Sequence, residues 1–184
     1  MNAGLIAHRY ARALLKYAKE TQTEDLVYSQ VSSLVKSFQD VPKFRDALER
    51  NPDLSIENKL ALIGTALNSD ICEEFRRFIR LVDQHSRMVF FSRMLTAYME
   101  RYREMKNIRI GTLITAAHQE DLQNRLESMV SADMGGTVNL STKVDESLIG
   151  GFVLQVGDLR MDASVAGQFQ RIRNALIEND NRII

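Results

Sequence analysis

The stretch Leu148-Ile149-Gly150-Gly151-Phe152-Val153-Leu154-Gln155-Val156-Gly157-Asp158 organises the C-terminal part of this chain. Its two adjacent glycines allow the backbone to turn, or to approach a neighbouring segment closely, without a Cβ penalty. The apolar run that follows places Phe152, Leu154 and Val156 on one face, which predicts a β-strand. Gly157-Asp158 then predicts a tight reversal, so that residues 159–161 can pair back as a second strand.

A closing helix is predicted to start near Val165, directly after these strands. Asp162 or Ser164 can accept hydrogen bonds from the free N–H groups of its first turn. The apolar positions of this helix recur at spacings of four, three and four, at Val165, Phe169, Ile172 and Leu176. One apolar stripe beside a small sheet is typical of a docking module, and nothing in this stretch indicates catalysis.

The hydrophobic period changes near Lys106, and we therefore expect a domain boundary at about residue 105. Residues 108–116 alternate with a period of two, which predicts a strand, and Gly135-Gly136 ends a helix predicted from about Gln119 to Asp133. The inward positions of that helix are expected at Leu122, Leu126, Met129 and Val130. A further alternating strand carries Val138, Leu140, Thr142 and Val144. Residues 106–184 are thus expected to form a small α/β domain with a short mixed sheet.

Residues 1–105 show helical periodicity throughout and carry no strand signal. Six helices are predicted, at 3–20, at 23–39, after Pro42, after Ser55, at 71–84 and at 88–105. Short turns join them, which is typical of one helical bundle. The expected fold class is mainly α: an N-terminal six-helix bundle over residues 1–105, followed by the smaller α/β domain over residues 106–184.

The first helix is more apolar than a single core requires. Its apolar residues cover an arc of roughly 200°, whereas a helix that covers one core needs a stripe a little over ~100° wide. The surplus indicates either that a partner covers a second side of this helix or that the helix lies at the centre of its own bundle. Both interpretations are open at this point.

Motifs at both ends of the chain resemble one known family. Gly150 to Gly157, preceded by Val138-Asn139-Leu140 and followed by Asp162-Ala163-Ser164-Val165, is similar to the C-terminal signature of the F-type ATP synthase delta subunit. The mitochondrial counterpart of that subunit is the oligomycin-sensitivity-conferring protein. Arg9-Tyr10-Ala11-Arg12-Ala13-Leu14 is similar to the first helix of the same family. One departure is Ala163, at a position where the family often has glycine.

The resemblance implies a non-catalytic subunit of the rotary, proton-translocating ATP synthase, which links the catalytic head to the peripheral stalk and resists the torque of the rotor. In that family the N-terminal bundle grips an N-terminal helical segment of an alpha subunit, in a groove between its first and fifth helices. The C-terminal domain meets the ends of the b subunits. The resemblance also implies one copy per complex, held peripherally at the cytoplasmic face of the bacterial inner membrane.

The resemblance assigns candidate site residues. The partner-binding positions are Ile6, Tyr10, Ala13, Leu14 and Tyr17 on the first helix, with Phe78, Leu81 and Val82 on the fifth. Ala13 is expected to border the groove, because in helical projection it lies between Ile6 and Tyr17 and beside the polar edge begun by Arg9 and Glu20. The positions with expected structural roles, setting the sheet and the start of the last helix, are Gly150, Gly151, Gly157 and Asp162.

The sequence contains no recognisable motif for catalysis, nucleotide binding or metal binding. His8, His85 and His118 lie far apart and match no zinc-binding pattern. Gly135-Gly136-Thr137 lacks the lysine of a phosphate-binding loop, and Cys72 has no catalytic context. We therefore expect no active site, no cofactor and no metal.

Charge gives no sign of a nucleic-acid or membrane partner. The 24 basic and 24 acidic side chains cancel, so no overall field attracts polyanions. The densest basic cluster, Arg76-Arg77 with Arg80, shares its helix with Glu73 and Asp83 and is better explained as a solvated helix face. Cys72 is the single cysteine, which excludes an internal disulfide. No apolar run approaches the ~20 residues of a membrane span, and residues 1–8 lack the features of a signal peptide.

An alternative of a different class is a stand-alone helical adaptor or regulatory protein unrelated to the synthase. An enzyme is disfavoured, because the chemistry that it would need is missing from the sequence.

Overall fold

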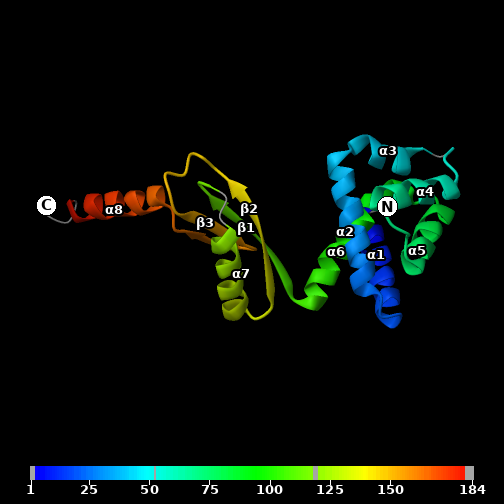
Figure 1. Ribbon diagram of the computed structural model, residues 1–184, viewed down its shortest axis with the longest axis horizontal. Coiled ribbons are helices and arrows are strands. Elements are labelled where there is room, and N and C mark those ends of the chain that lie inside the picture. The colour runs from blue at the N-terminus through cyan, green and yellow to red at the C-terminus, as the bar shows by residue number, and fades with distance from the viewer. Residues whose placement is uncertain (1–2, 52, 118–119, 181–184) are drawn as a thin grey trace. The chain divides into compact units, whose positions relative to one another are not determined.

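A computed structural model describes residues 3–51, 53–117 and 120–180 of the chain. The chain divides into two compact units, Met1–Met105 and Lys106–Ile184. The described residues form eight α-helices, one short 3-10 helix and four strands (Figure 1). The mainly helical class with a small sheet is therefore confirmed. No helix in the described part of the chain combines the length and the apolar character needed to cross a bilayer.

The first unit contains α1 (Ala3–Glu20), α2 (Glu24–Asp40), α3 (Pro42–Arg50), α4 (Ile56–Leu67), α5 (Glu73–Gln84), the 3-10 turn η1 (Met88–Phe90) and α6 (Phe91–Lys106). Ser55 caps α4, because its side chain accepts a hydrogen bond from the backbone N–H of Asn58 at 3.3 Å. The fifth helix begins two residues later than predicted. Cys72 has an extended backbone (φ −61°, ψ 152°), so buried Ile71 lies before the helix and not in it.

Aromatic rings form the centre of the first unit. Phe75 and Phe78 on α5 and Phe91 on α6 lie with each pair of ring centroids 6.4 Å apart. Tyr98 of α6 is fully buried, and its hydroxyl donates a hydrogen bond to the backbone carbonyl of Glu24 at 3.2 Å. Burying one large apolar side chain contributes roughly 1.5–3 kcal/mol. The three phenylalanines thus pack α5 against α6, and Tyr98 joins α6 to the start of α2.

A buried ion pair, which the sequence did not indicate, joins α4 to α5. The ammonium of Lys59 donates to Asp83 Oδ1 at 2.6 Å, and only 5% of Lys59 is exposed. The interpretation of Asp83 as a residue that dilutes surface charge on the fifth helix is therefore wrong. Its carboxylate neutralises a lysine that is enclosed between two helices, 24 residues away in sequence.

The second unit contains β1 (Ile108–Thr115), α7 (Glu120–Met134), β2 (Thr137–Val144), β3 (Phe152–Val156), β4 (Leu159–Asp162) and α8 (Val165–Asp180). The strand order is β2-β1-β3-β4. β1 pairs parallel with β2 and antiparallel with β3, and β3 pairs antiparallel with β4. The predicted mixed sheet is thus confirmed, with α7 as the crossover between the two parallel strands.

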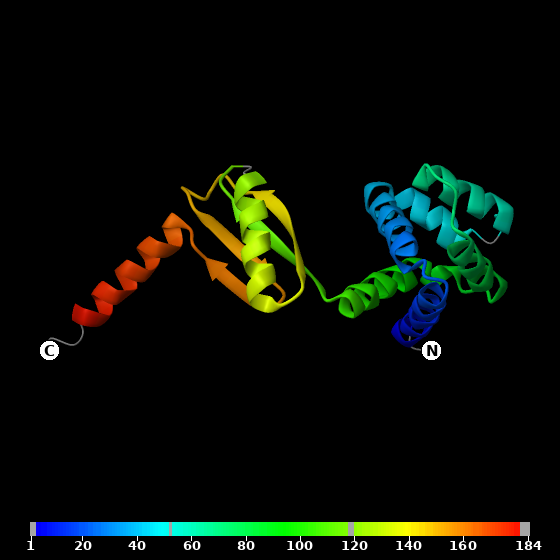
Figure 2. The ribbon, with the colours of Figure 1, turned by 60° about the horizontal axis from the view of Figure 1, so that its bottom comes forward.

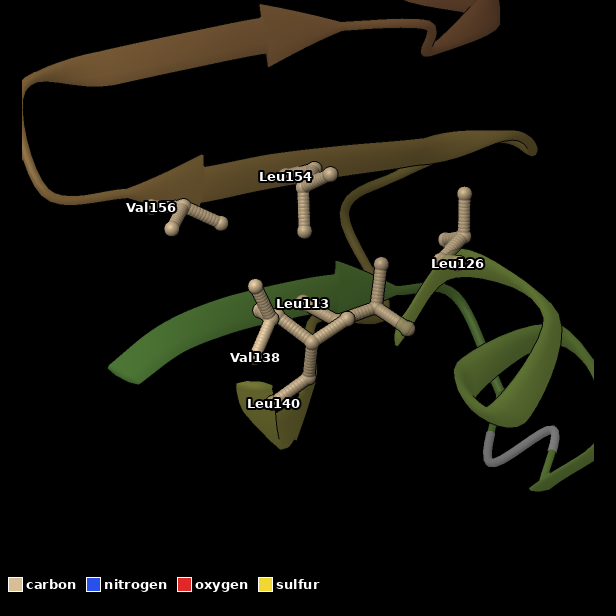
Figure 3. Close-up of a cluster of buried hydrophobic side chains, with 6 residues drawn as sticks. All are labelled: Leu113, Leu126, Val138, Leu140, Leu154 and Val156. Atoms are coloured by element: carbon tan, nitrogen blue, oxygen red, sulfur yellow. The ribbon is translucent and has the colours of Figure 1, made fainter. Parts of the chain in front are cut away.

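One face of the sheet packs against α7 (Figure 2). The buried cluster between them is shown in Figure 3 and consists of Leu113, Leu126, Val138, Leu140, Leu154 and Val156. Leu122 and Val130 pack against this cluster from the same helix. Met129 is exposed, so its predicted inward position is wrong. A helix over a narrow sheet buries only a stripe, and Met129 lies beyond the edge of that stripe.

The covered face of β1 is the one that carries fewer apolar residues. Leu113 is fully buried under α7, whereas Ile110, on the opposite face, is exposed. Gly111 shares the covered face, and a Cβ built there would lie 2.5 Å from Leu140 Cδ2 and 2.7 Å from Val156 Cγ2. The side chains of Leu140 and Val156, from the two neighbouring strands, therefore fill the space over Gly111 on the covered face. A residue with a side chain at position 111 would collide with them.

Candidate partner-binding site

Helices α1 and α5 lie side by side in the first unit (Figure 1). The ring of Tyr10 meets the ring of Phe78 edge to face, with centroids 6.3 Å apart. The Arg77 guanidinium donates a hydrogen bond to the hydroxyl oxygen of Tyr17 at 2.9 Å. The structure thus brings together the two helices from which the candidate residues were drawn.

The contacts between α1 and α5 show that the two helices run in opposite directions. Tyr17, near the end of α1, meets Arg77 near the start of α5, while Tyr10 accepts a hydrogen bond at 2.8 Å from Arg87, beyond the end of α5. Ala13 precedes Tyr17 by four residues and Leu81 follows Arg77 by four residues. Each therefore lies about one helical turn from the Tyr17–Arg77 hydrogen bond, in the same direction along the antiparallel pair.

Four of the eight predicted partner-binding residues are internal to the first unit. Tyr10, Leu14, Phe78 and Val82 are all buried. Their side chains fill the space between α1, α5 and the adjoining helices, so they belong to the core and not to an accessible surface. A partner cannot contact them while the helices are packed, so in a binding site they would only support the exposed residues.

The other four predicted residues are accessible. Ala13 is exposed, Leu81 is 43% exposed, and Ile6 and Tyr17 are half-buried. Leu5, which the sequence interpretation did not include, is 66% exposed. Leu5 lies among the charged residues of the polar arc of α1, about 100° from Ile6 in helical projection, so it does not belong to the same face. We call Ile6, Ala13, Tyr17 and Leu81 together the α1–α5 surface.

Basic side chains flank the α1–α5 surface on the side of α1. Arg9, Arg12 and Lys16 are exposed there. Lys16 forms only a long contact of 3.8 Å with Glu20, and Arg77 is bound to Glu73 at 2.9 Å. Exposed pairs of this kind contribute about 0–1 kcal/mol. The surface is thus a small set of apolar side chains beside a row of cations.

The four signature positions of the C-terminal stretch shape the second unit. Gly157, at φ +58°, forms the two-residue reversal between β3 and β4, where Val156 pairs with Leu159. Gly151 has φ +77°, and a Cβ on it would collide with the backbone carbonyl of Ala163. The backbone carbonyl of Gly150 accepts from the N–H of Val165 at 3.0 Å. These glycines therefore permit the close approach of the loop before β3 to the start of α8.

Ser164 is the residue that caps α8. Its hydroxyl oxygen accepts from the N–H of Gly167 at 3.0 Å. Asp162 Oδ1 in turn accepts from the hydroxyl of Ser164 at 2.6 Å and from its backbone N–H at 2.9 Å. These hydrogen bonds hold the pKa of the Asp162 carboxyl below its usual range. Asp162 thus orients the cap and does not itself bind the helix N–H groups.

Phe169 and Ile172 of α8 are 64% and 56% exposed. Val165 is half-buried, and the side chain of Leu176 lies outside the described part of the chain. On the last strand, Leu159 and Met161 are also exposed. The apolar stripe predicted for the closing helix therefore faces solvent over the described residues.

The groups considered for chemistry lie apart from one another. In the described part of the chain no three His, Cys, Asp or Glu side chains lie close enough to hold a metal ion; His118 lies outside that part. Burial raises the pKa of the Cys72 thiol, which favours its protonated form. Arg76 donates to the backbone carbonyl of Ile71 at 3.2 Å, and Arg77 binds Tyr17 and Glu73. Two of the clustered arginines are thus engaged within the protein.

Comparisons with known proteins point to one family. The model of the family "ATP synthase delta (OSCP) subunit" matches residues 6–176. The chain is similar to ATP synthase subunit delta of Phocaeicola vulgatus, at 41% identity over 100% of both chains, and of Bacteroides thetaiotaomicron, at 36% identity over 100% of both. It is also 37% identical to the Parabacteroides distasonis subunit, over 97% of this chain and 99% of the relative.

The fold is also similar to that of a chain in a solved assembly. That chain belongs to the Toxoplasma gondii mitochondrial ATP synthase hexamer, determined by electron cryo-microscopy. The TM-score is 0.65 at 23% sequence identity, and the match covers 93% of this chain and 97% of the other. At this identity the likeness bears on the fold alone.

Proposed function

Since this chain belongs to the ATP synthase delta (OSCP) subunit family, we propose that it is the non-catalytic subunit that links the catalytic head of a rotary, proton-translocating ATP synthase to its peripheral stalk. The alternative of an adaptor unrelated to the synthase is not supported, because relatives named ATP synthase subunit delta match the whole chain. The role is mechanical: the subunit resists the torque that rotation exerts on the head.

We assign the contact with the head to the first unit, in which α1–α6 act as one helical bundle. The observation that carries this assignment is the α1–α5 surface, where Ala13 and Leu81 are exposed apolar residues on two packed helices, each about one turn from the Tyr17–Arg77 hydrogen bond. Buried Tyr10 and Phe78 pack edge to face between the same two helices and support this surface from the core. An amphipathic helix from the N-terminus of an alpha subunit can lay its apolar face on such a surface.

We assign the contact with the stalk to the second unit. The exposed Phe169 and Ile172 of α8 and the exposed Leu159 and Met161 of β4 support this assignment. Large apolar side chains gathered on a small domain mark a surface that associates with another protein. The partners are the b subunits, and the chain is held at the membrane only through them and the head, as one copy per complex.

Copurification tests this function directly. A tagged full-length chain, expressed in its own organism, is expected to bring down the alpha and b subunits of the synthase. The Ala13→Asp variant should lose the alpha subunit first, because the change lies on the α1–α5 surface. Recovery of other proteins, with neither alpha nor b, would contradict the proposal.

A further inference from the structure

The charge on α1 is unlike that of the whole chain. The helix carries four basic side chains, Arg9, Arg12, Lys16 and Lys19, and one acidic side chain, Glu20. Its net charge is therefore +3, whereas the chain as a whole is neutral. This excess lies on the helix that supplies most of the α1–α5 surface.

The cations nearest Ala13 have no acidic partner of their own. Among the described residues, no carboxylate lies within ion-pair distance of Arg9 or Arg12. Arg9, Arg12 and Lys16 follow the spacing of three and four residues that places side chains on one helix face. Their row runs beside Ala13, on the side away from buried Tyr10 and Leu14.

Two of the three acidic side chains of α5 are bound within the protein. Asp83 is held by buried Lys59, and Glu73 is bound to Arg77, whereas half-buried Glu74 has no ion pair in the described part of the chain. Arg80 on the same helix is exposed and has no ion-pair partner in the described part of the chain. A helix docked on Ala13 and Leu81 would therefore meet a row of cations on α1 and, on α5, one unpaired carboxylate, that of Glu74, two helical turns from Leu81.

Resting on the proposed function, we propose that the helix that binds the α1–α5 surface carries a row of acidic side chains along the flank that faces Arg9, Arg12 and Lys16. The apolar contacts at Ala13 and Leu81 supply the affinity, and the charged flank selects the partner and fixes its direction. Complementary charge at the rim of an interface raises the association rate and disfavours wrong pairings.

A lipid surface is a less suitable ligand for the same row. Binding to anionic headgroups is typical of clusters of roughly 4–8 basic residues, or of one basic segment joined to a second anchor. Here α1 offers only the lower limit of that range, four basic side chains partly offset by Glu20, together with one exposed leucine, Leu5. The acidic helix is therefore the occupant to which the proposal commits.

The test uses the full-length chain and two synthetic peptides. One peptide, the native peptide, covers the N-terminal helical segment of the alpha subunit from the same organism. The other, which we call the amidated peptide, has every Asp and Glu side chain in that segment replaced by Asn and Gln. At low salt, the amidated peptide is expected to bind the wild-type chain on the order of tenfold more weakly than the native peptide. The difference should shrink at high salt, because exposed charges are then screened.

Two double variants locate the effect. Arg9→Gln with Arg12→Gln is expected to bind both peptides with nearly the same affinity. Lys36→Gln with Lys43→Gln, which removes the same charge from exposed positions on α2 and α3, should discriminate between the peptides as the wild type does. Sedimentation of the wild-type chain with phosphatidylglycerol vesicles, lost in the first variant only, would overturn the proposal in favour of a lipid ligand.

The failure of this inference differs from the failure of the proposed function. If the amidated peptide binds the wild-type chain as tightly as the native one, the acidic flank is refuted while the alpha-subunit contact stands. If the native peptide does not bind at all, the proposed function of the α1–α5 surface is itself contradicted.

Discussion

The hydroxyl oxygen of Tyr17 accepts a hydrogen bond of 2.9 Å from the Arg77 guanidinium, which joins α1 to α5 across 60 residues of sequence. An exposed hydrogen bond of this kind adds little to stability, because water competes for both groups. Its importance is geometric, because with the buried Tyr10–Phe78 contact it fixes the register of the two helices. Exposed Ala13 and Leu81 each lie about one turn from this hydrogen bond, on the two helices that it joins.

The buried ion pair between Lys59 and Asp83 should be important for the stability of the first unit. Asp83→Ala would leave the Lys59 ammonium enclosed without its carboxylate, and we expect the free energy of unfolding to fall by about 3 kcal/mol. Glu20→Ala is the matched control, since it removes the acid of an exposed pair at 3.8 Å; its effect should stay within about 0.5 kcal/mol. Urea unfolding followed by circular dichroism measures the unfolding free energy of both variants. Equal losses would contradict the importance of the buried ion pair.

Gly151 should tolerate a side chain less well than Gly157. Both have positive φ, so alanine at either position costs about 1–2 kcal/mol of backbone strain. Only at Gly151 would the new Cβ also collide with the carbonyl of Ala163, whereas nothing lies within 4 Å of a Cβ at Gly157. We expect Gly151→Ala to lower the stability of the second unit by at least about 1 kcal/mol more than Gly157→Ala. Hydrogen exchange of the backbone amides in β3 and β4 would measure the loss of stability in each variant.

The stability of the second unit should decrease in acid through Asp162. Hydrogen bonds from Ser164 hold the pKa of Asp162 below its usual range, so the ionised carboxylate stabilises the folded state at neutral pH. That contribution is lost as the pH falls from about 4 through the lower pKa of the folded state.

The variant Asp162→Asn separates this effect from that of Asp145, whose pKa is lowered by Ser147. At pH 7 the variant should melt below the wild type, and the two melting temperatures should converge on acidification. A difference that stays constant down to pH 3 would contradict the role of the Asp162 charge.

Local sequence signals predicted the elements of this fold, and contacts between distant residues decided the rest. The cap at Ser55 and the reversal at Gly157 depend on neighbouring residues, so the sequence could predict them. The alternation in β1 defines two faces but does not say which one is covered. β2 and β3 decide that, because Val138, Leu140, Leu154 and Val156 gather on the face of Leu113.

The candidate site shows the same division between local and distant information. The motif on the first helix predicted partner-binding residues there, and the structure then separated buried Tyr10 and Leu14 from exposed Ala13. Lys59 was missed because its partner lies on another helix, and a lysine in sequence is ordinarily a surface residue.

The two proposed contacts should be separable by substitution. Phe169→Asp with Ile172→Asp places charges on the exposed stripe of α8, so binding to the b subunits should be lost while binding to the alpha subunit remains. The single change Gln168→Asp, at an exposed polar position of the same helix, is the control. Loss of both partners in the double variant would mean that the stripe serves the fold of the chain and not one interface.

The most direct test of the central claim is calorimetric titration of the full chain with the N-terminal peptide of the alpha subunit. Ala13→Asp places a carboxylate on the α1–α5 surface, where docking would desolvate it, and we expect binding to weaken by about 100-fold, or roughly 3 kcal/mol. Ala47→Asp, at an exposed alanine of α3, should bind as the wild type does. Both variants should keep wild-type helicity. Wild-type affinity in a folded Ala13→Asp variant would contradict the assignment of this surface to the head of the synthase.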